Sequence, residues 1–506
     1  MAIPKIIGVE TEYGIIIRGT QDSNPIAASS LLINAYLQDL DRRSAEPAAA
    51  AKVGWDFEDE TPGNDARGGR TPGAMPPEVE THLVNAVLTN GARYYVDHAH
   101  PELSTPECAD ARSIVRFDRA AEEILVESMV AARNLLPPGQ ELVIYKNNSD
   151  RKGNSYGCHE NYLMDRLVPF GRIVTHAMAH FITRQVFTGA GKVGTEAPGL
   201  SWEDVPFQIT QRADFFEEEV GLETTLKRPI VNTRDEPHAD SQKYRRLHVI
   251  CGDANLSELA TFLKVGTTAL VLAMVEDDFL RRDFVFTAPV WCMRQVSYDL
   301  SLGLPLELAD GSTITALGVQ WELLDQARKY ADERGLEVVG DDVGREVLQR
   351  WEEVLTALEF DPSTLAGRLD WVTKHRLIDG YRDRHDLAWN DARLAAMDLQ
   401  YHDLRPAKSL ARRAGLERLV HDDAVRSAMT EPPTDTRAYF RGRCLAKWPN
   451  SVVAANWDSM VFDLGKDPLR RVPMMEPTRG TAAHVGKLLD ECDTPTDLLD
   501  RLGSPP

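Results

Sequence analysis

The chain lacks most of the features that mark secreted, membrane-spanning or nucleic-acid-binding proteins. Its six cysteines form no CxxC pair, which argues against a disulfide framework or a thiolate zinc site. Residues 1–7 lack the basic region and long apolar stretch of a signal peptide, and no apolar run approaches the length of a membrane span. A net charge of −21 argues against general binding of nucleic acid, which needs a basic face. We therefore expect a cytoplasmic protein that binds neither nucleic acid nor membrane.

The 506 residues are enough for a large core and for more than one domain. Strand-like segments recur between helical patterns, and helices dominate residues 313–420. The predicted strands are residues 93–97, 141–147, 157–163 and 244–251; the predicted helices are residues 27–41, 114–136, 170–187 and 256–277, the last with Asn255 as its N-cap. A proline-marked break at residues 431–434 predicts a large α+β domain over residues 1–428 and a small C-terminal domain over residues 429–506.

Residues 41–80 differ in composition from the rest of the chain. They contain five Pro, five Gly and seven Ala, together with an acidic cluster at residues 56–60. This composition predicts a long mobile loop and not a linker between domains, because strand-like and helical patterns resume directly after it. Such a loop inside an enzyme can be a lid or a substrate contact, and a tolerated insertion is an equal alternative.

An apolar run over residues 6–17 is interrupted by two acidic residues, Glu10 and Glu12. On a strand, side chains two residues apart point to the same face of the sheet. Two like charges side by side in an apolar strand are costly unless a cation lies beside them, and a divalent metal ion is the usual solution. The alternative is a strand end whose acidic side chains face water.

A second segment rich in functional groups covers residues 93–102. On a strand, Arg93, Tyr95 and Asp97 share one face. Arg93 could then hold a phosphate through two hydrogen bonds, and Asp97 could act as a base or a nucleophile. Glu102 follows after a turn and could be a further metal ligand. The alternative is an edge strand with an ordinary Arg–Asp pair.

Two further predicted strands carry histidine. His159 and Asn161 share a face of one strand, so that one could bind metal and the other a nucleotide, and His248 lies on the face of another. The alternative for each histidine is a hydrogen-bonded core residue. Four arginines could build the basic pocket that an anionic substrate needs in so acidic a chain: Arg212, Arg234, Arg245 and Arg246.

Familiar nucleotide and zinc motifs are only partly matched. Residues 189–194 fit GxGxxG but follow a helix, and Val193 stands where a P-loop needs Ser or Thr. His176 and His180 are four residues apart on a predicted helix without a third ligand, which favours helix packing. Carboxylates, a tyrosine and histidines on several strands instead suit Mg²⁺ or Mn²⁺ that holds nucleotide phosphates.

Four longer motifs carry a resemblance to a known family: GVETEYG, NGARYYVDHAHPELSTPEC, KNNSD with GNSYGCHENY, and NTRDEPHADSQKYRRLHVICGDAN. They resemble the carboxylate–amine ligases related to glutamine synthetase and, more narrowly, the enzymes that act on the prokaryotic ubiquitin-like protein Pup. The resemblance implies a glutamine-synthetase-like α+β fold, with a curved, mainly antiparallel sheet backed by helices. One of these enzymes is a ligase that joins Pup to lysines, and the other is a hydrolase that deamidates Pup and removes it from proteins. The insertion at residues 41–80 and the spacing from Asp97 to Glu102 resemble the hydrolase.

The resemblance also implies roles for the residues at matching positions. The implied metal ligands are Glu10, Glu12, Tyr95, Glu102, His159 and His248, and the implied nucleotide contacts are Arg93, Thr105, Asn161 and Trp457. Arg212 and Arg234 would hold the carboxylates of Pup's terminal residue, and Asp97 would be the nucleophile or the general base. The implied cofactors are ATP and Mg²⁺, with ATP bound and not consumed in each turnover.

The implied reaction is hydrolysis of a side-chain amide at Pup's last residue. This amide is either the carboxamide of a C-terminal Gln or the isopeptide bond to a protein lysine. The expected partners are therefore Pup and pupylated proteins, and we expect the protein to be a monomer. Alternatives are a Pup–protein ligase that consumes ATP, a Pup-binding adaptor without turnover, and a small-molecule glutamate–amine ligase.

Overall fold

A ten-stranded sheet runs through the structure, a computed structural model that describes residues 1–506 except 22–23, 44–52, 59, 71–83, 466 and 504–506. Neighbouring strands are antiparallel, with the exception of the parallel pair β3 and β18. In spatial order the strands are β15 (Tyr244–Val249), β10 (Cys158–Asp165), β1 (Ile7–Glu12), β8 (His100–Ser104), β7 (Arg93–Asp97), β6 (Asn85–Val87), β3 (Gly54–Trp55), β18 (Val452–Ala455), β19 (Ser459–Phe462) and β20 (Arg470–Pro473). The mainly antiparallel sheet implied by the resemblance is confirmed.

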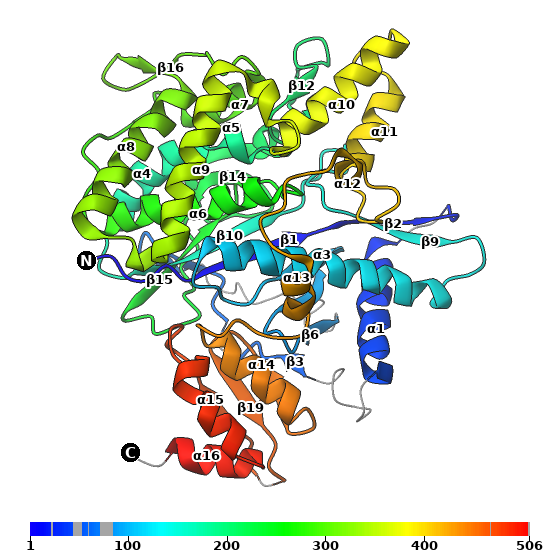
Figure 1. The fold of residues 1–506 in the computed structure, drawn as a ribbon, viewed down its shortest axis with the longest axis vertical. Helices are drawn as coiled ribbons and strands as arrows, with labels where there is room; N and C mark the ends of the chain where they lie inside the picture. Colours follow the sequence, from blue (N-terminus) through cyan, green and yellow to red (C-terminus); the bar gives the residue numbers. More distant parts are fainter. Residues whose placement is uncertain (22–23, 44–52, 59, 71–83, 466, 504–506) are drawn as a thin grey trace.

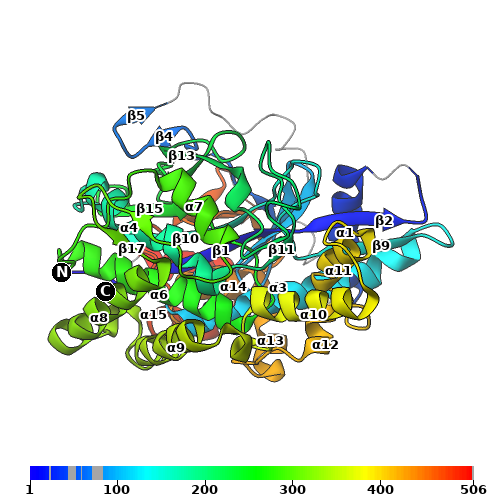
Figure 2. The same ribbon diagram turned by 90° about the horizontal axis from the view of Figure 1, so that it is seen from above.

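The central strands have one covered and one open face because their residues alternate in polarity. In β1, Ile7 and Val9 are buried in the largest hydrophobic cluster, whereas Glu10 and Glu12 point to the opposite face. Helix α3 (Ala111–Ala132) contacts β1 and helix α6 (Glu258–Glu276) contacts β10, and both lie on one side of these strands in Figure 2. The face that carries the acidic residues is therefore left free for a functional site.

Helix α6 lies at the centre of the helical layer. Its length and composition would allow it to cross a membrane, and within the described residues it is the one helix of this kind, so the expectation that no apolar run is long enough is wrong. The helix is buried along its length against α3, α4 (Phe170–Thr183), α8 (Ala316–Arg334) and α9 (Asp341–Phe360), so core packing accounts for its composition. The prediction of Asn255 as its N-cap is also wrong, because the Ser257 side chain accepts the hydrogen bond from the Ala260 N–H.

The predicted strands and helices are confirmed to within a few residues, and the predicted helix over 170–187 is divided into α4 and α5 (Gln185–Thr188). The other α-helices that the structure describes before residue 429 are α1 (Pro25–Arg43), α7 (Pro289–Tyr298), α10 (Asp370–His385), α11 (Ala392–Tyr401), α12 (Leu410–Ala414) and α13 (Asp422–Ala428). The two-stranded sheets pair β2 (Gly14–Arg18) with β9 (Glu141–Tyr145), β4 (Asn64–Asp65) with β5 (Gly69–Arg70), β11 (Lys192–Val193) with β12 (Phe207–Gln208), β13 (Phe216–Gly221) with β14 (Arg228–Asn232), and β16 (Leu306–Glu307) with β17 (Thr313–Ile314).

The C-terminal segment lies at the lower end of the molecule in Figure 1. It contains α14 (Ala438–Lys447), α15 (Ala482–Glu491), α16 (Pro495–Gly503) and strands β18–β20. These elements share a hydrophobic cluster with Val53, Trp55 and Val87. Because β3 joins β18 to the large sheet, the sheet continues across the predicted boundary at residue 428, and the division into two domains stays a prediction.

The described part of the predicted insertion packs against the sheet and one neighbouring segment. Trp55 lies in β3, between β6 and β18. Further along, the Ala66 N–H donates to the Thr233 carbonyl at 2.8 Å, and the Asp235 N–H donates to the Asn64 carbonyl at 2.9 Å. Residues 44–52, 59 and 71–80 of the insertion lie outside the described residues, and its predicted mobility stays a prediction.

Candidate active site

Strand register gathers the predicted site residues on the open face of the sheet. β1 lies between β8 and β10, and β15 flanks β10 on its other side. The register partners are Glu10 with His159, Asn161 with His248, Glu12 with Glu102, and Tyr95 with Glu102. Residues that are far apart in the sequence therefore become neighbours across five strands.

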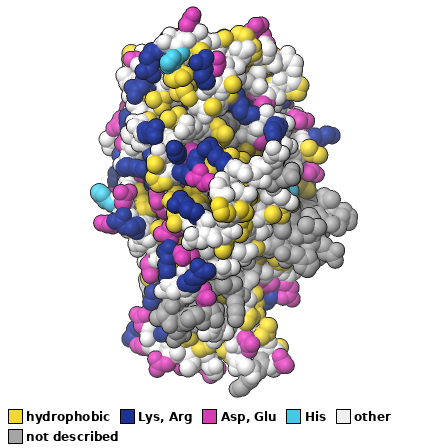
Figure 3. Space-filling view, turned by 90° about the vertical axis from the view of Figure 1, so that its right-hand side faces the viewer, with side chains coloured by type: hydrophobic (Ala, Val, Ile, Leu, Met, Phe, Trp, Pro, Cys, Tyr) yellow, Lys and Arg dark blue, Asp and Glu magenta, His cyan; other side chains and the backbone are white. Residues whose placement is uncertain are grey.

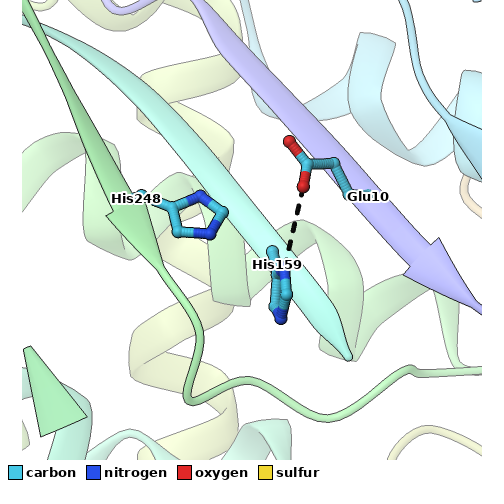
Figure 4. A group of neighbouring side chains, drawn as sticks. All are labelled: Glu10, His159 and His248. Atoms are coloured by element: carbon cyan, nitrogen blue, oxygen red, sulfur yellow. Dashed lines mark ion pairs between the residues drawn. The ribbon is translucent and has the colours of Figure 1, made fainter. Parts of the chain in front are cut away.

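Glu10, His159 and His248 form the first cluster, with one ligand atom from each lying within 4.8 Å of the others. Figure 4 shows their three strands side by side and the ion pair between Glu10 and His159, whose Oε2 and Nδ1 are 3.6 Å apart. His248 Nδ1 lies 3.0 Å from Asn161 Oδ1 and also 3.0 Å from Arg246 Nη1, whereas its Nε2 is buried without a hydrogen-bond partner among the described residues. If Nδ1 donates to Asn161, Nε2 keeps the lone pair that a metal ligand needs.

The charges of this first cluster also suit a metal ion. Burial acts to raise the pKa of Glu10, but His159, His248 and Arg246 outweigh it and hold the pKa well below its usual range. Burial, reinforced by Arg246, lowers the pKa of His248 well below its usual value. At neutral pH Glu10 is therefore ionised and His248 is neutral, which are the forms in which these side chains bind metal.

Glu12, Asp97 and Glu102 form the second cluster, again with one oxygen from each lying within 4.8 Å of the others. The Tyr95 hydroxyl donates to Glu102 Oε1 at 2.5 Å, and His98 Nδ1 lies 2.9 Å from Asp97 Oδ2. Burial, together with Asp97 and Glu12, raises the pKa of Glu102 well above its usual value. Burial also acts to raise the pKa of Asp97, but His98 and Arg93 lower it overall. Asp97 is thus a readily ionised carboxylate, as a nucleophile or general base must be.

Both clusters fit metal ions. Three adjacent carboxylates repel one another without a cation, and an all-oxygen set suits Mg²⁺. The first cluster adds two imidazoles, which transition-metal ions also accept. The unpartnered Nε2 of His248 points to a missing ligand there, and metal binding itself stays a prediction.

Two adjoining cavities surround the clusters. The smaller has an empty volume of about 560 Å³, and Thr105, Asn161 and Trp457 are among its lining residues. The larger has about 1570 Å³ of empty space and contains Arg93, Asp97 and residues of both clusters. Five residues line both cavities: Glu10, Ser104, His238, Arg246 and Trp457. A cavity that opens beside residues able to hold metal ions is the kind of site that a nucleotide with its phosphates requires.

Arg93 is held between two aromatic rings at the edge of the larger cavity. Its guanidinium carbon lies 3.9 Å from the ring centroid of Trp55 and 3.9 Å from that of Tyr95. Its Nε donates to Asn85 Oδ1 at 3.0 Å. Trp55 also packs edge-on against Trp457, with ring centroids 5.1 Å apart. Stacking on both faces restricts the guanidinium to the plane between the rings, which fixes its donors beside the cavity.

The two arginines predicted to bind substrate have different surroundings. Arg234 lines the larger cavity, and its Nε is buried without a hydrogen-bond partner among the described residues. Arg212 is buried and lines neither cavity. It donates to Ser155 Oγ at 3.2 Å and to the carbonyls of Ile250 and Gly252. The structure therefore brings Arg234 into the site and leaves Arg212 outside the lining of the two cavities, and both roles stay predictions.

Several residues at the site were missed from the sequence. His238 lines both cavities with a left-handed backbone, at φ 47°, and the polar segment around it was the available signal. Trp55 and Phe57 reach Arg93 from the predicted insertion, with the Phe57 ring centroid 6.0 Å from the guanidinium carbon. Aromatic residues inside an acidic, Ala- and Gly-rich segment were the signal for these two.

Comparison with known proteins identifies the family of this site. The family model described as Pup-ligase protein matches residues 5–461. The chain belongs to the Pup-ligase family. Within this family it is 53% identical to the depupylase of Acidothermus cellulolyticus, over 98% of this chain and 99% of that protein. It is 46% identical to the Pup deamidase/depupylase of Mycobacterium tuberculosis, over 99% of each chain.

Two solved structures of a Pup-ligase family member share the fold. The Pup ligase PafA in complex with Pup matches with a TM-score of 0.79 and 30% identity, over 99% of this chain and 94% of that chain. PafA in complex with ADP matches with a TM-score of 0.73 and 35% identity, over 80% of this chain and 89% of that chain. These matches confirm the predicted α+β class, a sheet backed by helices.

Proposed function

We propose that the protein is a nucleotide-dependent hydrolase that acts on a side-chain amide at the last residue of Pup. It converts a C-terminal Gln to Glu and cleaves the isopeptide bond between Pup and protein lysines. The observation that carries this proposal is the readily ionised Asp97, in one cluster with Glu12 and Glu102 beside the larger cavity. The identity to depupylases is 46–53% over 98–99% of this chain, against 39–40% over 80% of it for Pup–protein ligases, which favours the hydrolase over the ligase within the family.

Asp97 acts on the amide in one of two ways. As a nucleophile, one of its oxygens attacks the amide carbon, the amine leaves with a proton, and water then hydrolyses the anhydride. As a base, it takes a proton from the water molecule that attacks the same carbon. His98 holds the carboxylate in place in either case. Both routes add one water and give Glu and a free amine, so one site serves ammonia and lysine leaving groups.

The proposed cofactors are ATP and Mg²⁺. Glu10, His159 and His248 would hold one ion, and Glu12 and Glu102 another, with Tyr95 bonded to Glu102. Bound Mg²⁺ would stabilise the negative charge of phosphates and of the oxygen that develops in the reaction. The ADP complex of PafA supports nucleotide binding. In the proposed site the nucleotide would lie in the smaller cavity, where Thr105, Asn161 and Trp457 would surround it and Arg93 would meet its phosphates. Amide hydrolysis needs no energy input, so ATP is bound without being consumed in each turnover.

The proposed partners are Pup and pupylated proteins. The PafA–Pup complex supports Pup as a partner, and Arg234 and Arg212 would hold the carboxylates of Pup's terminal residue. We also propose that the protein is a monomer and is located in the cytoplasm. All six cysteines are buried and unpaired, which suits a reducing compartment.

Incubation with Pup ending in Gln, with and without ATP and Mg²⁺, tests this function by mass spectrometry. We expect conversion of the carboxamide to the carboxylate only with nucleotide and metal. Asp97→Asn should lower the rate by about a thousandfold or more, whereas Asp342→Asn, at an exposed carboxylate on α9, should not. Formation of one ADP for each product would contradict the hydrolase and favour the ligase, and a wild-type rate in Asp97→Asn would contradict the role of Asp97.

A further inference from the structure

Asn161 lies between two members of the first cluster and contacts both of them. It is on β10, which runs between the strands of Glu10 and His248 in Figure 4. Its Nδ2 donates to Glu10 Oε1 at 2.8 Å, and its Oδ1 lies 3.0 Å from His248 Nδ1. The two ends of one amide group therefore touch two residues that could bind the same ion.

The neighbours of this amide allow it one orientation. An ionised Glu10 accepts hydrogen bonds and cannot donate them, so the amide nitrogen must face it. Arg246 donates and cannot accept, and its Nη1 bonds to Asn161 Oδ1 at 2.5 Å, so the amide oxygen must face the guanidinium. Rotation of the amide by half a turn would place its oxygen against a carboxylate and its nitrogen against a cation. The charges on both sides therefore determine which end of the amide points to which neighbour.

Arg246 is itself held in place by its surroundings. On the face of the molecule in Figure 3, basic and acidic side chains are interspersed at the surface, where water and salt screen their charges. The Arg246 side chain is 10% exposed, so neighbouring protein groups must compensate its charge. Its Nε donates to the Glu236 carbonyl at 2.6 Å, and its Nη2 lies 3.7 Å from Glu236 Oε2. These contacts keep Nη1 beside Asn161.

The oriented amide determines which nitrogen of His248 carries hydrogen. The neutral ring has a single N–H, on Nδ1 or on Nε2. Hydrogen on Nδ1 is donated to Asn161 Oδ1, and Nε2 then keeps a lone pair. In the other form Arg246 Nη1 donates to Nδ1, and Nε2 carries a buried N–H without an acceptor among the described residues. An N–H buried in this way costs about 1–3 kcal/mol, whereas a lone pair at the same place is available to an ion.

Asn161 also determines which oxygen of Glu10 is free. Its Nδ2 engages Oε1, whereas Oε2 lies 3.6 Å from Nδ1 of His159, the third member of the cluster. Glu10 Oε2 and His248 Nε2 are thus left for the ion. A ligand that is already held in its binding orientation need not be ordered when the metal arrives.

We propose that Asn161 is a positioning residue of the first metal cluster, with Arg246 fixing the orientation of its amide. Through one amide group Asn161 holds Glu10 and selects the form of His248 whose Nε2 binds the ion. The resemblance assigns Asn161 a nucleotide contact, and this role is additional to it. The inference rests on the proposed function, in which the first cluster holds a metal ion.

NMR of protein with ¹⁵N-labelled histidine, without metal or nucleotide, tests the form of His248 directly. Each ring nitrogen has a chemical shift that depends on whether it carries hydrogen, and the His248 signals are those missing from His248→Ala. We expect hydrogen on Nδ1 in the unmodified protein and on Nε2 in Asn161→Ala, where Arg246 remains beside Nδ1. Asn161→Asp keeps an oxygen acceptor and should retain hydrogen on Nδ1. Loss of packing alone would not move hydrogen from one nitrogen to the other.

Titration calorimetry with Mn²⁺ alone tests the consequence for metal binding. We expect Asn161→Ala to weaken Mn²⁺ binding by about tenfold or more, the usual loss when a hydrogen-bond partner of a metal ligand is removed. Because nucleotide is absent, the loss of a nucleotide contact cannot contribute. The matched control is Asn390→Ala, at an exposed asparagine between α10 and α11, which should leave the affinity unchanged.

The possible results are distinct. Hydrogen on Nε2 in the unmodified protein would overturn the inference, because Arg246 and not Asn161 would then hold the ring. Equal Mn²⁺ affinity in the unmodified protein and in Asn161→Ala would overturn it as well, while the proposed metal site would stand. Absence of Mn²⁺ binding from the unmodified protein would contradict the proposed function and the inference with it. Asn161→Asp is close in size to the native residue, so hydrogen on Nε2 in that variant would overturn the inference even if Asn161→Ala failed to fold.

Discussion

Glu107 lines the smaller cavity and is expected to hold the C-terminal segment beside it, and Glu107→Gln tests how strongly it does so. Its carboxylate accepts hydrogen bonds from Arg437 Nε at 2.7 Å and from Arg441. Arg441 in turn donates to the Trp457 carbonyl at 3.1 Å, and its guanidinium carbon lies 5.1 Å from the Trp457 ring centroid. Removal of one partner from such a buried network leaves the remaining charges uncompensated.

The pKa of Glu107 gives the magnitude. Burial acts to raise it, but Arg441 and Arg437 outweigh burial and lower the pKa from 4.5 to about 2. A tenfold change in proton affinity corresponds to about 1.4 kcal/mol, so the ionised carboxylate stabilises the fold by about 3 kcal/mol at neutral pH. Because the folded-state pKa is the lower one, this contribution is present above pH 4.5 and is lost as the pH falls through 2. At about pH 3.5, about 1.4 kcal/mol of it has been lost.

Urea unfolding followed by tryptophan fluorescence measures this contribution. We expect Glu107→Gln to lower the free energy of unfolding by about 3 kcal/mol at neutral pH, and by about 1.4 kcal/mol less at about pH 3.5. The control is Glu322→Gln, which breaks an exposed ion pair with Arg282 and should cost no more than about 0.5 kcal/mol. A difference between wild type and Glu107→Gln that is the same at both pH values would refute the electrostatic reasoning.

Two further predictions concern the cofactor sites. Glu10→Gln and His248→Ala should each weaken Mn²⁺ binding by about tenfold or more in calorimetric titrations. The control is His421→Ala, at an exposed position, which should leave Mn²⁺ affinity unchanged. An equal loss of affinity in all three variants would contradict metal binding by the first cluster. Trp55→Ala should weaken binding of a fluorescent ADP analogue by about fivefold, because Arg93 loses one stacking ring worth about 1 kcal/mol, and Trp55→Phe should retain most of the affinity. Unchanged affinity in Trp55→Ala would show that the stack does not position Arg93 for nucleotide.

Local sequence patterns determined which side chains share a face. The two-residue spacing of Glu10 and Glu12, and the alternation of Arg93, Tyr95 and Asp97, are properties of any extended strand, so the sequence predicted them correctly. The positions of the helices were predicted equally well, because the periodicity of apolar residues is a local property of the sequence. The exception was the start of α6, where the sequence predicted Asn255 as the N-cap, whereas the Ser257 side chain accepts the hydrogen bond from the Ala260 N–H.

Only the tertiary structure decided which strands are neighbours and which side chains meet. The register that places Glu10 beside His159, and Asn161 beside His248, depends on pairings between distant segments that no local pattern specifies. Long-range packing also places Arg212 away from the two cavities, where it donates to a backbone carbonyl. It likewise places Trp55, from a segment predicted to be a loop, in the sheet and in contact with Arg93. The sequence thus determined the chemistry available on each strand, whereas the strand order, which depends on burying one common apolar face, decided where that chemistry is concentrated.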